Sequence, residues 1–193
     1  MSTHYRNRRL FSSGGRTVYT WSDYTNEVRR LSEDHDTIVI NTDGGCSNNG
    51  YSNAQASYGV FFGPDSTFNE CGELPHDLRQ TSQTAELYAA KMALETVLSM
   101  VYNYEGYQMG GFERVVLFSD SAWLINGITN WIWTWERNGY RNSSGRVVSN
   151  WQLWEELHNM ILEIQGNGFE VCFMHVNRES NREADALARS VLY

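Results

Sequence analysis

Two acidic residues follow apolar runs that have the composition of buried strands. Asp43 comes directly after residues 37–42, TIVINT, and Asp120 comes shortly after residues 114–118, RVVLF. Functional side chains gather at strand ends in mixed α/β sheets, so neighbouring strands would bring these two carboxylates close together. The two strands therefore predict the start of an acidic site.

Two further acids lie in segments with helical spacing. Glu86 falls in the first turn of a predicted amphipathic helix over 84–102, for which Thr84 is the expected N-cap. Asp185 lies among small apolar neighbours in a predicted final helix over 181–192. Any one such acid is more often a helix cap or a surface charge. That interpretation weakens when four acids stand at these element ends.

Several converging carboxylates would repel one another strongly unless cations lay between them. Magnesium prefers hard oxygen ligands and keeps several waters, which suits a few acids together with a substrate phosphate. Two such ions can activate a water and stabilise the leaving oxygen of a phosphodiester. The four acids thus suggest metal-dependent phosphodiester chemistry, although periodicity alone does not decide it.

The elements that must position these acids alternate along the chain. The predicted strands are 37–42, 56–62, 67–73, 114–118 and 169–174, and the predicted helices are 84–102, 121–128, 150–165 and 181–192. Three antiparallel strands followed by alternating helices and strands predict an α/β fold, with a five-stranded mixed sheet and helices on both faces.

Composition limits how the chain could hold a partner. Its 193 residues suffice for one domain, and the net charge of −8 argues against binding nucleic acid by bulk charge. Three cysteines without a CxxC pair are typical of a reducing intracellular protein with free thiols. No run of 18 apolar residues occurs, so no membrane span is expected. We expect a monomer and leave nucleus, cytoplasm and mitochondrion open.

The N-terminal segment is basic. The first 22 residues contain no acid and include Arg6, Arg8, Arg9 and Arg16, a composition shared with mitochondrial presequences. We favour the alternative that residues 1–36 form an extension packed on a domain made of residues 37–193.

Five blocks make the chain resemble the type 1 ribonuclease H family, and its cellular eukaryotic, fungal-like members in particular. They are TDGGCSNNG (42–50), LRQTSQTAEL (78–87), FSDSAWLINGITNWIWTWERNGY (118–140), SSGRVVSN (143–150) and HVNRESNREADALA (175–188). They occur in the family's order across most of residues 37–192. The resemblance implies a ribonuclease H-like fold and an endonuclease that hydrolyses the RNA strand of RNA/DNA hybrids, leaving 5′-phosphate and 3′-hydroxyl ends.

The resemblance also implies roles for the acids. Asp43, Glu86, Asp120 and Asp185 would hold two Mg²⁺ ions, for which Mn²⁺ can substitute. Asp43 would bridge both ions, Asp185 would serve the ion nearer the attacking water, and the other two acids the ion nearer the leaving oxygen. His175, ten residues before Asp185, matches a mobile-loop histidine that assists proton transfer and product release.

Recognition of a hybrid depends on the 2′-hydroxyl of one strand and its absence from the other. The resemblance implies RNA-strand contacts from Asn49, Ser82 and Gln83. It implies DNA-strand contacts from Trp123, Trp131, Trp135 and Ser143 along a deoxyribose channel, and from Arg79, Thr81 and Asn150 in a phosphate pocket. Of the other tryptophans in this region, Trp133, Trp151 and Trp154 are expected in the core.

The chain also departs from the family's pattern. Ser82 and Thr84 stand where the family often has Asn and Arg, and Trp123 where a smaller aromatic is common. Residues 1–36 do not resemble the family's separate hybrid-binding module. Together with the net charge of −8, these departures predict modest hybrid affinity and low processivity.

Two alternatives remain beside an active ribonuclease H. One is a catalytically weak binding module on the same fold, because a fold does not guarantee a function. Such a module would be expected to have a broken set of acids, and here the set is intact. The other is a ribonuclease H domain from a retroelement polyprotein or another fold relative, against which the short length and the starting Met1 favour a free-standing protein.

Overall fold

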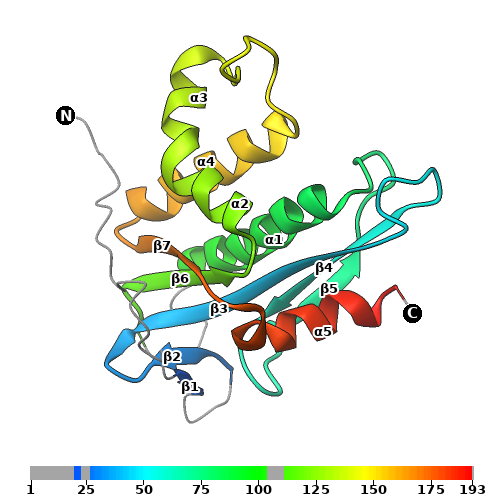
Figure 1. Cartoon of the computed structure of the whole chain (residues 1–193). Helices are drawn as coiled ribbons and strands as arrows, with labels where there is room; N and C mark the ends of the chain where they lie inside the picture. The colour runs from blue at the N-terminus through cyan, green and yellow to red at the C-terminus, as the bar shows by residue number, and fades with distance from the viewer. Residues whose placement is uncertain (1–19, 23–26, 104–110, 193) are drawn as a thin grey trace.

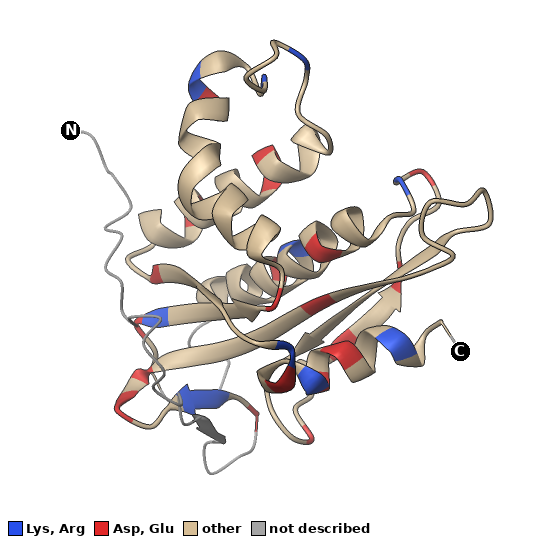
Figure 2. Ribbon diagram, viewed as in Figure 1, with Lys and Arg blue, Asp and Glu red and all other residues tan. Residues whose placement is uncertain are grey.

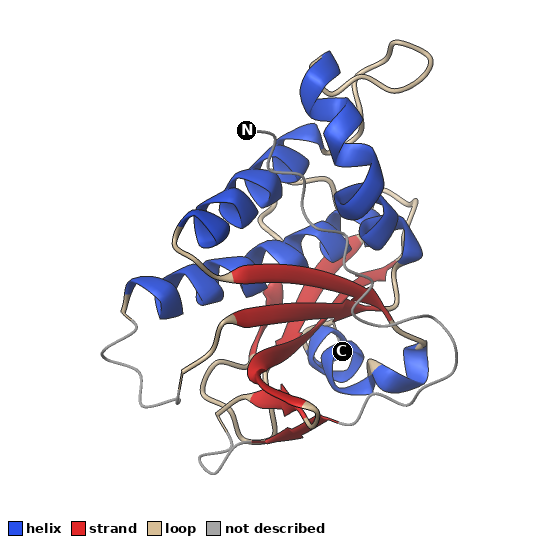
Figure 3. Cartoon of the chain, turned by 90° about the vertical axis from the view of Figure 1, so that its left-hand side faces the viewer, coloured by secondary structure: helices blue, strands red, loops and turns tan. Residues whose placement is uncertain are grey.

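A mixed β-sheet lies at the centre of the structure, with helices on both faces (Figures 1 and 3). The computed structural model describes residues 20–22, 27–103 and 111–192. Its strands are β1 (Thr20–Ser22), β2 (Arg29–Leu31), β3 (Asp34–Ser47), β4 (Gln55–Phe61), β5 (Glu70–Glu73), β6 (Arg114–Ser119) and β7 (Glu170–His175). Its helices are α1 (Ser82–Tyr102), α2 (Ala122–Asn126), the π-helix η1 (Gly127–Trp131), α3 (Ile132–Asn138), α4 (Trp151–Gly166), the 3-10 helix η2 (Arg178–Ser180) and α5 (Arg182–Ser190).

The five predicted strands form the main sheet in the spatial order β5-β4-β3-β6-β7. Strands β3, β4 and β5 pair antiparallel, whereas β6 and β7 run parallel to β3. A parallel connection needs a crossover, and α1 makes the one from β5 to β6. The predicted α/β fold with a five-stranded mixed sheet is thus confirmed.

Two further strands extend this sheet from the segment predicted as an N-terminal extension. Strand β2 pairs antiparallel with the beginning of β3, and β1 pairs antiparallel with β2. The backbone N–H of Arg29 donates to the carbonyl of Phe62 at 2.6 Å, so β2 continues the line of β4 along one edge of β3. Residues 1–19 and 23–26 lie outside the described residues, and the division at residue 36 stays a prediction.

Strand β3 is longer than the predicted run 37–42. Its pairing with β6 ends at Asn41, but its pairing with β4 continues from Asn41 to Ser47. Asp43 therefore lies inside a strand, opposite Gly59, and not at a strand end as predicted. The apolar run marks only the part of β3 covered on both edges, because the antiparallel hairpin beyond it is more polar.

Helices α1 and α4 cover one face of the sheet and α5 the other (Figures 1 and 3). The main core lies under α1, where Leu87, Leu94 and Val97 are fully buried. The N-cap of α1 is Thr81, whose hydroxyl accepts a hydrogen bond from the backbone N–H of Thr84 at 3.2 Å. The prediction of Thr84 as the N-cap was therefore wrong. Among the described residues, no helix combines the length and apolar character that a membrane span requires.

The tryptophan-rich segment forms three helical pieces where one helix, 121–128, was predicted. These pieces, α2, η1 and α3 (residues 122–138), are called the tryptophan arm below, and Figure 1 shows α3 standing away from the sheet. Trp154 of α4 is fully buried, and Trp133 and Trp151 pack against the core, as predicted. A Cβ on Gly127 would lie 2.1 Å from the Trp154 ring, so only glycine allows this close packing.

Candidate active site

Three carboxylates converge where β6 has ended and β3 continues. Asp43 lies in β3, Asp120 follows the last residue of β6, and Glu86 lies one turn inside α1. Each offers an oxygen atom, and these oxygens all lie within 4.8 Å of one another. Helix α1 begins two residues earlier than predicted, so Glu86 belongs to its second turn and not to its first.

Close backbone contacts bring these elements together. A Cβ on Gly44 would lie 2.3 Å from the backbone nitrogen of Glu86, so its absence lets α1 press against β3. A Cβ on Gly59 would lie 2.4 Å from the carbonyl oxygen of Ala184, so its absence lets α5 press against β4. The two glycines thus position Glu86 on one face and the neighbour of Asp185 on the other.

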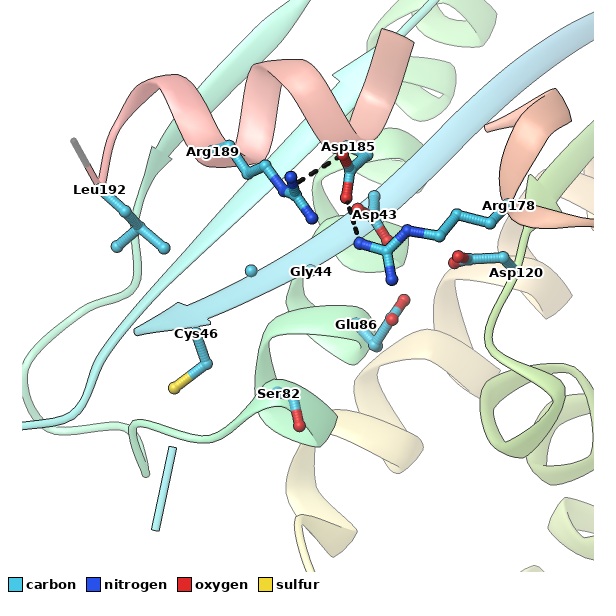
Figure 4. A pocket seen from close by; sticks show the side chains of 11 residues that line it. Asp43, Gly44, Cys46, Ser82, Glu86, Asp120, Arg178, Asp185, Arg189 and Leu192 are labelled. Carbon is cyan, nitrogen blue, oxygen red and sulfur yellow. Dashed lines mark hydrogen bonds and ion pairs between the residues drawn. The ribbon is translucent and has the colours of Figure 1, made fainter. Parts of the chain in front are cut away.

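Asp185 shares a pocket of about 600 Å³ with the three converging acids (Figure 4). Both of its carboxylate oxygens already have a positively charged partner. Oδ1 accepts a hydrogen bond from Arg178 Nη2 at 2.8 Å, and Oδ2 forms an ion pair with Arg189 Nε at 3.1 Å. The structure therefore groups three of the four predicted acids tightly and places the fourth at the same pocket, paired with arginines.

Two buried asparagines fix the start of α5 beside Asp43. Asn41 Nδ2 donates to Asn181 Oδ1 at 3.1 Å and to the Ser180 carbonyl at 3.0 Å. In return, Asn181 Nδ2 donates to the carbonyl of Thr42 at 3.0 Å. Buried amides hold their geometry when each polar atom has a partner, so this pair ties the loop before Asp185 to β3.

The converging acids are electrostatically unfavourable as free anions. Burial, together with the charges of Asp120 and Asp185, raises the pKa of Asp43 to about 8. Burial and the charges of Asp43 and Asp120 raise the pKa of Glu86 well above its ordinary value, against a hydrogen bond from the Ser119 hydroxyl that lowers it. A nearby cation would relieve this repulsion.

The residues at this pocket fit a divalent metal ion. They offer carboxylate oxygens, which are the hard donors that Mg²⁺ and Mn²⁺ prefer. Asp43 is only 7% exposed, so its ionised form needs a compensating positive charge. Asp43, Glu86 and Asp120 could hold such an ion directly, with Asp185 available beside Asp43 in the same pocket (Figure 4).

The prediction expected His175 in a mobile loop. In the structure it is the last residue of β7. Its exposed ring places Nε2 3.1 Å from the carbonyl oxygen of Asp120, the residue that follows its strand partner Ser119. The loop that follows carries Arg178 next to Asp185. Because the loop between β7 and α5 is short, the residue ten positions before Asp185 lies at the end of a strand.

The residues predicted to contact RNA gather where the β3–β4 turn meets α1. Asn49 Nδ2 donates to Ser82 Oγ at 3.2 Å, and Asn49 Oδ1 accepts from the Ser82 backbone N–H at 3.4 Å. Gln83 is exposed beside them, and Ser82 also lines the carboxylate pocket. The structure therefore brings these three residues together at the acidic site.

The residues predicted to contact DNA are spread over more elements. Trp131 is 39% exposed, and its ring centroid lies 5.7 Å from that of the half-buried Trp135. Trp123 packs edge-on against Trp154 at 5.1 Å, and Ser143 is exposed in the loop after α3. The tryptophans thus form one aromatic group on the tryptophan arm.

The predicted phosphate pocket draws on the starts of α1 and α4. Arg79 is exposed before α1, whereas the hydroxyl of Thr81 is engaged in capping that helix. Asn150 precedes α4 in a left-handed conformation, with φ of 59°, and its side chain makes no capping bond. The amide of Asn150 and the guanidinium of Arg79 are therefore the groups suited to a ligand.

Sequence reasoning missed Arg178 and Arg189 as pocket residues. Arg189 had a usable signal, since it stands four residues after Asp185 on one helix and such pairs face each other. Arg178 had none, because its contact depends on how the short loop folds back over the acids.

Comparison with known proteins identifies the family. Residues 35–193 match the RNase H family model. Ribonuclease H1 of Rattus norvegicus is 37% identical over 158 residues, which are 80% of this chain and 50% of the rat protein, and Ribonuclease H1 of Homo sapiens is 37% identical over the same length. Ribonuclease H of Ehrlichia chaffeensis is 31% identical over 164 residues, 83% of this chain and 97% of that protein. The chain spans about half the length of its mammalian relatives.

Solved structures share the fold. The foamy viral protease-reverse transcriptase in complex with an RNA/DNA hybrid aligns with a TM-score of 0.60 at 17% identity, over 80% of this chain and 20% of the viral one. LC11-RNase H1 in complex with an RNA/DNA hybrid aligns with a TM-score of 0.55 at 18% identity, over 79% of this chain and 94% of that one. Since the family model covers the five strands of the main sheet and all four acids, and the bacterial relative is covered over 97% of its length at 31% identity, the chain belongs to the type 1 ribonuclease H family.

Proposed function

We propose that this protein hydrolyses the RNA strand of RNA/DNA hybrids by two-metal-ion catalysis, giving 5′-phosphate and 3′-hydroxyl ends. The observation that carries the proposal is the cluster of Asp43, Glu86 and Asp120, whose carboxylate oxygens lie within 4.8 Å of one another in a member of this family. If it bound no metal ion, this buried cluster of acids would only lower the stability of the folded protein.

Magnesium is the proposed metal, with Mn²⁺ as a substitute. Asp43, Glu86 and Asp120 would hold one ion, and Asp43 and Asp185 would hold the second across the pocket. Bound ions supply activation of the attacking water and neutralisation of the leaving oxygen. The buried Asp43 fixes the position of the site, because β3 stays paired with β4 through this residue, from Asn41 to Ser47.

Second in importance is proton transfer, for which His175 is the proposed group. Its exposed imidazole lies beside the backbone of Asp120, within reach of solvent and of the pocket rim. An imidazole can take up or release a proton near neutral pH. Its backbone is held at the end of β7.

Strand selection is proposed to come from two different surfaces. Asn49, Ser82 and Gln83 offer amide and hydroxyl groups to the 2′-hydroxyls of the RNA strand. The DNA strand would lie along Trp123, Trp131, Trp135 and Ser143, with a phosphate held by Arg79, Thr81 and Asn150. Flat aromatic rings against deoxyribose leave no hydrogen-bonding partner for a 2′-hydroxyl, which disfavours RNA there.

The distribution of surface charge supports binding of the substrate through specific contacts and not through overall electrostatic attraction. In Figure 2 the basic residues are scattered over several elements, and α5 carries both signs. The net charge of −8 adds repulsion of phosphate backbones. We therefore infer that hybrid binding is weak and sensitive to salt. We also propose that the enzyme is a monomer, which light scattering after gel filtration would check.

One assay tests the function. A labelled RNA/DNA hybrid, duplex RNA, duplex DNA and single-stranded RNA are each incubated with the protein in Mg²⁺, in Mn²⁺ and in chelator. The expected result is cleavage of the hybrid's RNA strand alone, only with metal, leaving 5′-phosphate and 3′-hydroxyl ends. A hybrid that stays intact in both metals would show that the enzymatic proposal is wrong.

A further inference from the structure

Arg178 lies over the carboxylate pocket on the short loop between β7 and α5. Its Nη2 donates to Asp185 Oδ1 at 2.8 Å, and Figure 4 shows its guanidinium directed among Asp185, Asp43, Asp120 and Glu86. The bond to Asp185, and then the charges of Asp120 and Asp43, raise its pKa. A permanent positive charge thus stands beside all four acids of the site.

The loop holds the backbone of Arg178 firmly while leaving its side chain in solvent. Asn177 Oδ1 accepts from the backbone N–H of Ser180 at 2.9 Å, and the buried Asn181 anchors the loop to β3. The Arg178 side chain is 65% exposed, whereas that of Asp185 is 20% exposed. The guanidinium can therefore leave the pocket by rotation of its own side chain, without opening a cavity in the core.

Arg189 provides a contrast on the same acid. It forms an ion pair with the other oxygen of Asp185 at 3.1 Å, from the next turn of α5. The charge of Arg178 lowers the pKa of Glu86, after burial and the charges of Asp43 and Asp120 have raised it, whereas Arg189 is not among the main influences on Glu86. Of the two arginines, Arg178 is thus the one that acts on the whole cluster.

We propose that Arg178 is an internal cation of the metal centre, which competes with a divalent ion for Asp185. This proposal rests on the metal-dependent function proposed for the same pocket. An arginine keeps its charge at every accessible pH, so it can leave Asp185 only by displacement. The three clustered acids would then accept an ion readily, and the Asp185 side would accept one only as Arg178 withdraws.

Substrate would assist this withdrawal. A guanidinium binds phosphate oxygens as readily as carboxylate oxygens, often through two parallel hydrogen bonds. A phosphodiester entering the pocket would offer Arg178 a second anion at the moment that Asp185 is needed by the metal. Arg178 would in this way link loading of the second ion to arrival of the substrate.

The test measures metal binding without nucleic acid. Mn²⁺ is titrated calorimetrically into the wild type, Arg178→Ala, Arg178→Lys and the matched control Arg189→Ala. We expect Arg178→Ala to bind Mn²⁺ about tenfold more tightly than the wild type, a difference of about 1.4 kcal/mol. In Arg189→Ala the Mn²⁺ affinity should change by less than about threefold, about 0.65 kcal/mol. Arg178→Lys, which keeps the charge but not the planar fork, should fall between wild type and Arg178→Ala.

Thermal unfolding gives the second measurement. In chelator Arg178→Ala should melt below the wild type, because four acids lose their neighbouring cation, and saturating Mn²⁺ should remove the difference. Mn²⁺ binding that is unchanged or weaker in Arg178→Ala overturns the proposal, as does a wild type that binds no Mn²⁺. Tighter Mn²⁺ binding in a protein that cleaves no hybrid would leave this proposal standing and reject the proposed function instead.

Discussion

The carboxylate pocket and the tryptophan arm are built in opposite ways. The pocket joins β3, β6, α1 and α5 through contacts so close that Gly44 and Gly59 have no room for a Cβ. The arm is made of consecutive short helices whose rings pack on one another, with Trp131 still 39% exposed. A reacting group must be fixed by its scaffold, whereas a surface that accepts a flexible polymer can rely on aromatic area. Chemistry and grip should therefore fail separately when each region is altered.

The largest effect is expected at the pocket. Asp120→Asn removes one anionic ligand from the three-acid cluster, and we expect hybrid cleavage to fall by about a thousandfold or more, on the order of 4 kcal/mol in barrier. Hybrid binding should change little, since the tryptophan arm is untouched. Single-turnover cleavage and a separate binding measurement in Ca²⁺ check the two quantities.

Asp77→Asn is the matched control, because Asp77 is exposed and lies outside the pocket. It should cleave at the wild-type rate. Near-normal turnover of Asp120→Asn would remove Asp120 from the metal site and break the distinction between pocket and arm.

The next effect concerns the scaffold of the pocket. Gly44→Ala would place a methyl 2.3 Å from the backbone nitrogen of Glu86, so α1 has to move from β3. We expect a loss of about 1–3 kcal/mol in the free energy of unfolding, as for other overpacked sites, together with weaker metal binding. Denaturant unfolding with and without Mn²⁺ measures both.

Gly166→Ala is the control, since a Cβ there meets nothing within 4 Å at the end of α4. It should leave metal binding alone. A stable Gly44→Ala with unaltered Mn²⁺ affinity would mean that the close contact does not set the position of Glu86.

A further effect should appear in the pH dependence of stability. The pKa of Asp43 is raised to about 8 in the folded protein, above about 3.9 in the unfolded chain. The folded state then binds the extra proton, so in chelator the free energy of unfolding should fall as pH rises from about 5 to about 8. Each kcal/mol corresponds to about 2–4 °C in Tm for a chain of this size.

Added Mg²⁺ should flatten this pH dependence, because the metal favours the ionised carboxylate. Asp43→Asn should flatten it as well, without metal. Melting curves in chelator that keep one Tm across this pH range would contradict the raised pKa.

The smallest effect is expected on the arm. Trp131→Ala removes an exposed ring that is proposed to lie on deoxyribose, and we expect hybrid affinity to fall by about tenfold, in line with about 1–3 kcal/mol per aromatic stacking contact. Tm and Mn²⁺ affinity should stay as in the wild type. Leu162→Ala, which has the same 39% exposure on α4, is the control. Unchanged hybrid binding in Trp131→Ala would end the assignment of the arm to the DNA strand.

The sequence allowed the main elements and the acids to be predicted, because strand and helix periods and ordered motifs are local properties. The end of β3 was missed, since it depends on its antiparallel partner β4 and not on apolar content. The same holds for β2, whose three residues carry no strand pattern and gain their order from β3.

Long-range contacts explain the remaining differences at the site. His175 was chosen by its distance along the chain from Asp185, and its role stays a prediction. Arg178 was missed, because its contact with Asp185 depends on the fold of the loop between β7 and α5. Gly127, the first residue of η1, packs closely against Trp154, which comes from another helix. Neither contact has a local signature.

The dispersal of the acids along the chain has a consequence for folding. They come from β3, from α1, from the end of β6 and from α5, so the pocket exists only when early and late parts of the chain have met. Contacts of such high sequence separation form slowly and late. A bound ion should therefore leave the folding rate almost unchanged and slow unfolding instead. The metal would in this way increase the kinetic stability of the folded protein.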